Sequence, residues 1–161
     1  MGRVFFNTRA NITELTASTY QVLASDSGKT FVLNSAAAMT ITLPTDADIE
    51  LGWNCRFIMN LDNNDAYNIN CSDVTDSTGQ MFDGGLNVQA IADTAAATFQ
   101  AAIVPAGDDS SIILDTNLAN NEAKQGSFVD LIYIETNRFM VSGHILTADV
   151  DGSGQGIFAN V

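Results

Sequence analysis

The residues that could do chemistry in this 161-residue chain are few: a single histidine, His144, and two cysteines, Cys55 and Cys71. A hydrolytic triad needs a nucleophile, a general base and an orienting acid, and His144 lies inside the apolar stretch 142–146. We interpret it as a strand histidine whose hydrogen bonds are satisfied within the fold. The sequence has no G-x-x-x-x-G-K-[ST], H-E-x-x-H or G-x-S-x-G motif. We therefore expect no enzymatic activity and no cofactor.

The best metal-like constellation is Asp149, Asp151 and Ser153, where oxygen-bearing residues alternate around Gly152 as in the first half of a calcium loop. A complete loop ends in a bidentate Glu, and the twelfth position here is Asn160. A flexible acidic turn is the simpler interpretation, with a calcium site as the alternative.

The two cysteines fall in predicted neighbouring strands, residues 53–61 and 67–71, joined by a turn at 62–65. In a hairpin of these strands Cys55 and Cys71 could face each other. A reducing cytosol favours free buried thiols over a disulfide. A metal site is the third alternative, although no His or further Cys lies at ligand spacing.

The element around which the chain is organised is residues 26–44, which read as turn, strand, short link and strand. Apolar and polar residues alternate in both predicted strands, and Pro44 ends the second one. We expect a hairpin whose alternating face supplies core: Phe31, Leu33, Met39, Ile41 and Leu43.

The rest of the chain also reads as short strands. Residues 128–134 and 138–146 flank a turn at 135–137 and are apolar almost throughout, which predicts a hairpin buried on both faces. About ten short strands at roughly 8–12-residue spacing are typical of an all-β protein. We expect an antiparallel β-sandwich, jelly-roll-like, or a distorted barrel. No period of 20–50 residues repeats, so no solenoid is expected.

The first 18 residues read either as an ordinary first strand or as an extended N-terminal arm, and residues 19–161 as one β-rich domain. The arm would bind a partner surface through basic and aromatic or apolar side chains: Arg3, Val4, Phe5, Phe6 and Arg9.

The charge is strongly acidic, with six Lys and Arg against nineteen Asp and Glu and a formal net charge of −13. Such a chain repels nucleic-acid phosphates, so nucleic acid is not an expected partner. No apolar run approaches the ~20 residues of a membrane span, and residues 1–10 lack the pattern of a secretion signal. We expect synthesis and assembly in the cytosol.

Three stretches together resemble a known module: A-S-D-S-G-K-T-F-V-L-N-S-A-A-A-M-T-I-T-L-P at 24–44, L-G-W-N-C-R-F-I at 51–58 and D-L-I-Y-I-E-T-N-R-F-M-V-S-G at 130–143. The chain resembles the β-rich module of tailed-bacteriophage virion proteins, chiefly capsid decoration (cement) proteins and some fibre proteins. G-Q-G-I-F at 154–158 is similar to the close of the decoration group. Phe139 departs from the Trp or Tyr usual there.

The resemblance implies a homotrimeric structural protein that binds the major capsid protein on the capsid exterior and stabilises the shell by bridging its subunits. It would join the virion in the host cytoplasm. The arm would grip the shell, and the late hairpin would supply the oligomer interface through Phe128, Leu131, Tyr133, Phe139 and Val141.

The alternative is a head- or tail-fibre adhesin that binds host glycans, with Trp53, Tyr67 or Tyr133 stacking on sugar rings. The simpler interpretation of Trp53 is a core anchor. Fibres usually carry collagen-like repeats or heptads, and this chain has neither, which favours cement.

Overall fold

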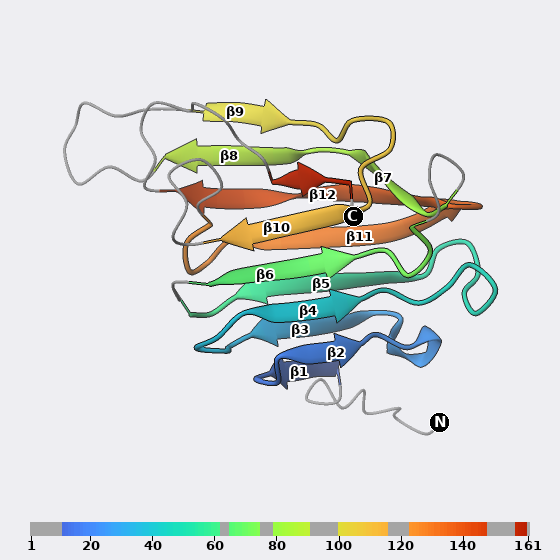
Figure 1. The fold of residues 1–161 in the computed structure, drawn as a ribbon, viewed down its shortest axis with the longest axis horizontal. Coiled ribbons are helices and arrows are strands. Elements are labelled where there is room, and N and C mark those ends of the chain that lie inside the picture. The colour runs from blue at the N-terminus through green and yellow to red at the C-terminus, as the bar shows by residue number, and fades with distance from the viewer. Residues whose placement is uncertain are drawn as a thin grey trace, which may run out of the picture.

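The fold consists of two β-sheets packed face to face (Figure 1). The computed structural model describes residues 11–61, 65–74, 79–90, 100–115, 123–147 and 157–160. These residues form thirteen strands, eight in one sheet, here sheet A, and five in the other, sheet B. The predicted all-β sandwich is confirmed, and both described sheets end in edge strands rather than closing into the alternative barrel.

Each sheet draws strands from both halves of the chain. Sheet A has the order β1 (Ile12–Leu15), β3 (Lys29–Leu33), β5 (Asn54–Met59), β11 (Phe128–Glu135), β12 (Arg138–Thr147), β8 (Leu86–Ala90) and β9 (Gln100–Ile103), and β7 (Met81–Gly84) also pairs with β12. Sheet B has the order β13 (Phe158–Ala159), β10 (Ser111–Asp115), β6 (Ala66–Asn70), β4 (Met39–Thr42) and β2 (Thr19–Gln21).

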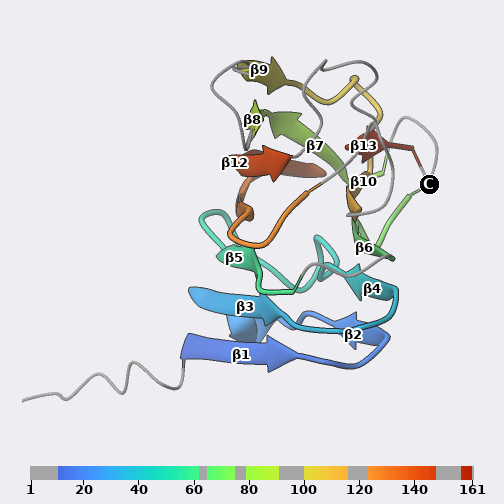
Figure 2. The same cartoon turned by 90° about the vertical axis from the view of Figure 1, so that its left-hand side faces the viewer.

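The first six strands alternate between the sheets, so the N-terminal half winds as a coil that rises from β1 and β2 (Figure 2). β1, β3 and β5 pair in parallel in sheet A, and β2, β4 and β6 pair in parallel in sheet B. The expectation of antiparallel sheets is therefore wrong, because both sheets are mixed. The turns of this coil differ in length, and the sequence has no repeat of 20–50 residues, so the coil is part of a sandwich and is not a repeat solenoid.

Two predicted hairpins are instead arches, in which two consecutive strands lie in different sheets and are not hydrogen-bonded to each other. β3 pairs with β1 and β5, whereas β4 pairs with β2 and β6, so residues 34–38 carry the chain from sheet A to sheet B. The same holds for β5 and β6, which are not hydrogen-bonded to each other. An arch and a hairpin both bury every second side chain, which is why alternation alone does not distinguish them.

β1 lies within the stretch predicted as an arm or a first strand. It pairs with β3 in the register Ile12↔Thr30 to Leu15↔Leu33. Residues 11–18 are thus part of the sandwich, and the first ten residues lie outside the described part of the chain.

The C-terminal half extends both sheets of the coil. β11 and β12 form the predicted hairpin, and Asn137 in its turn has a positive φ of 63°. β11 pairs antiparallel with β5, and β10 pairs antiparallel with β6. Gly143 allows a close approach inside the hairpin, because a Cβ there would lie 2.3 Å from the Phe128 carbonyl oxygen.

The core lies between the sheets, and the alternating face predicted for residues 26–44 supplies part of it. Phe31 stacks on Phe57 of the next turn at 5.2 Å between ring centroids. All five predicted core residues are fully buried, which confirms the prediction: Phe31, Leu33, Met39, Ile41 and Leu43.

Replacing a core residue of the coil with a carboxylate should destabilise the protein strongly. Ile41→Asp places a charge without a partner between the sheets, and we expect the free energy of unfolding in urea to fall by roughly 3 kcal/mol or more. The control is Thr42→Asp, because the next side chain points away from the core and is half-buried. Equal losses for the two variants would contradict the inward face.

Candidate functional site

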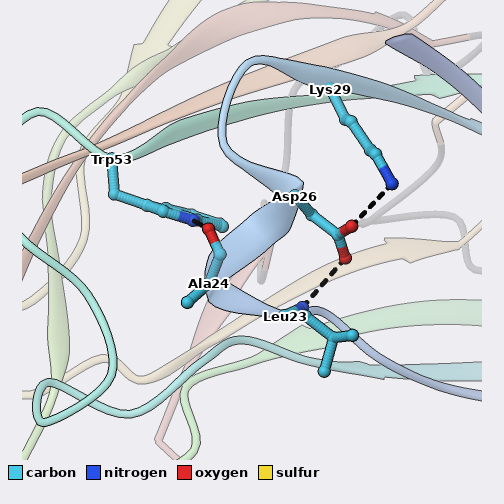
Figure 3. Close-up of polar contacts among 5 residues, drawn as sticks. All are labelled: Leu23, Ala24, Asp26, Lys29 and Trp53. Carbon is cyan, nitrogen blue, oxygen red and sulfur yellow. Dashed lines mark hydrogen bonds and ion pairs between the residues drawn. The ribbon is translucent and has the colours of Figure 1, made fainter. Parts of the chain in front are cut away.

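The D-S-G-K stretch of the resemblance forms a corner between sheets B and A. After β2, the 3-10 helix η2 (Ala24–Asp26) and a turn at Gly28, with φ of 80°, lead into β3. Figure 3 shows the buried Asp26 carboxylate between two donors. The Leu23 N–H donates to it at 2.9 Å and the Lys29 ammonium at 2.7 Å. This ion pair raises the pKa of Lys29 and fixes the corner.

Trp53 fastens the same corner to the next turn of the coil. Its indole Nε1 donates to the Ala24 carbonyl oxygen at 3.0 Å, as drawn in Figure 3. Its ring packs edge-on against Phe139, and only 5% of the residue is exposed. The prediction of a core anchor is confirmed.

The aromatic residues proposed for glycan stacking are enclosed by the fold. Tyr67 is fully buried and donates its hydroxyl to the Ser35 carbonyl, and Tyr133 is 5% exposed. Together with Trp53 they present almost no ring surface to a sugar. The prediction that these three residues stack on glycans is wrong, because the alternation of the strands turns them inward.

Gln80 is a polar side chain that the fold encloses almost completely, at 1% exposure. Its amide oxygen accepts from the backbone N–H and hydroxyl of Ser72, and its amide nitrogen donates to the Pro44 carbonyl and to Asp46. Asp46 in turn accepts from the Asn137 N–H at 2.6 Å. The group ties the β11–β12 turn to the loops after β4 and β6, which makes it structural.

The cysteines are free and buried, as predicted. Cys55 lies in β5 of sheet A, and Cys71 follows β6 of sheet B, so no hairpin places them opposite each other. Burial raises the pKa of both thiols well above its ordinary value. They stay protonated at neutral pH and are poor nucleophiles and metal ligands.

The predicted oligomer interface on the β11–β12 hairpin is wrong for four of its five residues. Leu131, Tyr133, Phe139 and Val141 point into the core and are at most 5% exposed. They offer no surface to a second copy. The fifth, Phe128, is half-buried on the opposite side of the hairpin.

That opposite side carries the apolar residues that the sequence analysis did not select. Ile132 is 43% exposed, and Ile134 and Met140 are 39% exposed. Ile132 pairs with Met140 across the hairpin, and half-buried Val32, Ile58 and Phe128 form a row across β3, β5 and β11. We call this set of six residues the outer A face. The signal for these residues in the sequence is their position: along each strand they alternate with the buried core residues.

Both arginines on and beside the outer A face form ion pairs within the protein. Arg56 donates to both oxygens of Asp130, at 2.6 and 2.7 Å, and its guanidinium lies over the Phe128 ring at 4.9 Å from the centroid. Arg138 contacts Asp83 at 3.2 Å and Glu135 at 3.9 Å. A hollow of about 340 Å³ lies beside Arg56 and Ile132.

The remaining predicted site residues fall into two groups. His144 lies half-buried in β12, which confirms its predicted place in a strand, and its imidazole makes no hydrogen bond with the described residues. The others lie outside the described residues, where their roles stay predictions: Arg3, Val4, Phe5, Phe6, Arg9, Asp149, Asp151 and Ser153.

Within the ranges that the structure describes, no group of three or more His, Cys, Asp or Glu side chains is placed to hold a metal ion. None of the helices there has the length and apolarity needed to cross a membrane. No protein-family model, curated protein or solved structure matches the chain.

Removing the Asp26 carboxylate should loosen the corner. Asp26→Ala leaves the Leu23 N–H without its acceptor and Lys29 without its ion pair, so we expect the free energy of unfolding to fall by about 1–3 kcal/mol. Asp48→Ala is the control, because it removes an exposed carboxylate that accepts only from Thr45. Chemical denaturation that gives the same change for both variants would contradict a structural role of Asp26.

Proposed function

We propose that this protein is a structural virion protein, a decoration or cement protein that binds the exterior of a phage capsid as an oligomer and bridges shell subunits. The support is twofold: the ordered motifs at 24–44, 51–58 and 130–143, and an exposed face suited to contact. The observation that carries the proposal is the outer A face. It is broad, built on hydrogen-bonded strands and apolar, in a chain of net charge −13.

The apolar content of the outer A face favours burial against a partner. Ile132, Ile134 and Met140 lie next to one another on two paired strands, and single exposed apolar residues are common on surfaces whereas adjacent ones mark interaction sites. The hydrogen-bonded strands fix the backbone of these residues, so binding requires no ordering of a loop.

The charge distribution favours a second copy of this chain as the occupant of the face. Two copies of net charge −13 repel each other over most approaches. On the outer A face the carboxylates of Asp130 and Asp83 are neutralised by Arg56 and Arg138. Copies that meet through this face therefore bury apolar area beside carboxylates whose charge is already paired. The homotrimer that the resemblance implies would use this face in place of the enclosed side of the hairpin.

Electron microscopy of intact particles tests the function directly. A cement protein occupies the capsid exterior in many symmetry-related copies. A few copies per particle, or a location confined to the tail, would contradict the proposal.

Charging the outer A face should dissociate the oligomer. Ile132→Asp with Met140→Asp places two carboxylates where we expect apolar contact, and association should weaken by roughly 2 kcal/mol or more, about 30-fold in dissociation constant. Sedimentation equilibrium measures this. Thr40→Asp with Asn68→Asp adds the same charge to the outer side of sheet B and should leave the oligomer intact. Equal dissociation by both pairs, or a monomeric natural protein, would contradict the assignment.

Deleting residues 1–9 should separate shell binding from oligomer formation. If Arg3 and Arg9 grip an acidic shell, the shortened protein remains a folded oligomer but no longer decorates purified capsids in a cosedimentation assay. Arg3→Gln with Arg9→Gln is the matched variant, which removes the charges and keeps Val4, Phe5 and Phe6. If the shortened protein still decorates capsids, the surface that binds the shell must lie elsewhere in the chain.

A further inference from the structure

A second surface feature lies on sheet A at the end opposite to β1. There β12, β8 and β9 are adjacent strands (Figure 1), and an open hollow of about 410 Å³ lies over them. Its lining comes from all three strands: Asn87, Val88, Gln89, Ala101, Ala102 and His144. It is separate from the hollow beside Arg56, with which it shares no lining residue.

Strand register explains why the surface is hollowed here. His144 pairs with Asn87, and Asn87 pairs with Ala102, so these three side chains form one row across the outer side of the sheet. Gln89 lies two residues beyond Asn87 and is exposed on the same side, whereas Val88 between them is buried. The row ends in the short methyl group of Ala102, which leaves the space above β9 unfilled.

The polar groups around the hollow are free to bind a ligand. The side chains of Asn87, Gln89 and His144 make no hydrogen bond with any described residue. Each amide offers two N–H donors and a carbonyl acceptor, and a neutral imidazole offers one of each. A sugar hydroxyl also donates and accepts, so these side chains can hydrogen-bond the hydroxyls of a sugar.

The described lining of the hollow favours a neutral ligand. Among the residues that the structure describes, no Lys or Arg lines the hollow to bind a phosphate or carboxylate, and no Asp or Glu lines it to bind a cation. The net charge of −13 further repels nucleotides and acidic sugars. The volume is within the ~300–1,000 Å³ usual for small-molecule sites.

We propose that this hollow binds a neutral sugar unit of a glycan through Asn87, Gln89 and His144. This goes beyond capsid decoration, because it adds a ligand site on the surface of the protein. It also differs from stacking on Trp53, Tyr67 and Tyr133, which the core encloses.

The test is NMR titration of the full-length protein with the methyl glycosides of glucose, galactose, mannose and N-acetylglucosamine. At least one should shift the side-chain amide signals of Asn87 and Gln89 and the His144 ring signals, saturably and with a dissociation constant on the order of 1 mM. Methyl glucuronide should bind more weakly than the glucoside because it is anionic. Ala102→Phe fills the hollow and should abolish the shifts.

The control is Ala37→Phe, the same change at an exposed position in the loop between β3 and β4. It should leave the titration unchanged, and thermal melting checks that both variants are folded. No saturable shift with any of the four glycosides, or shifts that persist in Ala102→Phe, would overturn the proposal. Sedimentation of the same samples reports oligomer formation separately, so a failed sugar titration with an intact oligomer counts against the hollow alone.

Discussion

The fold depends on the burial of alternate side chains between two sheets. In the coil of β1 to β6, strands that follow one another in the sequence lie in different sheets and are not hydrogen-bonded to each other. β3 and β4 are consecutive in the chain, but β3 is hydrogen-bonded to β1 and β5, whereas β4 is hydrogen-bonded to β2 and β6. Both strands contribute fully buried side chains, such as Phe31 and Ile41, to one hydrophobic core cluster. The backbone hydrogen bonds between the strands of the coil therefore join residues far apart in sequence, and packing across the core must hold each arch in place while these bonds form.

Polar groups at the corners make this arrangement specific. The Asp26 carboxylate closes the turn from sheet B to sheet A, and Trp53 fastens that turn to the strand one turn higher. Gln80 and Asp46 do the same between the loops after β4 and β6 and the late hairpin. A buried polar group without its partner costs free energy, so an alternative pairing of the strands that breaks these contacts is disfavoured. The motifs on which the resemblance rests are largely these corner and core residues.

Alternation in the sequence predicted which side chains are buried but not which strands pair. Phe31, Leu33, Met39, Ile41 and Leu43 were identified correctly, because the two-residue period of a strand is local. The arch at 34–38 was not identified, because the strands on either side of it are hydrogen-bonded to strands far away in sequence and not to each other. In the hairpin at 128–146 both faces are apolar, so the sequence did not tell the core side, Leu131 and Tyr133, from the outer side. The hollow depends on the pairing of β8 with β12 and could not be foreseen either.

The two outer sides of the sandwich differ in a way that core packing does not require. On sheet B, the outer positions of the coil strands carry half-buried, uncharged polar residues: Thr40, Thr42, Asn68 and Asn70. On sheet A the equivalent positions carry Val32, Ile58 and Ile132, and the charges among them are paired internally. Stability alone would be served by polar residues on both outer sides. The apolar residues of sheet A lower solubility without adding to the core, so a contact beyond the single chain is the simplest physical reason for them.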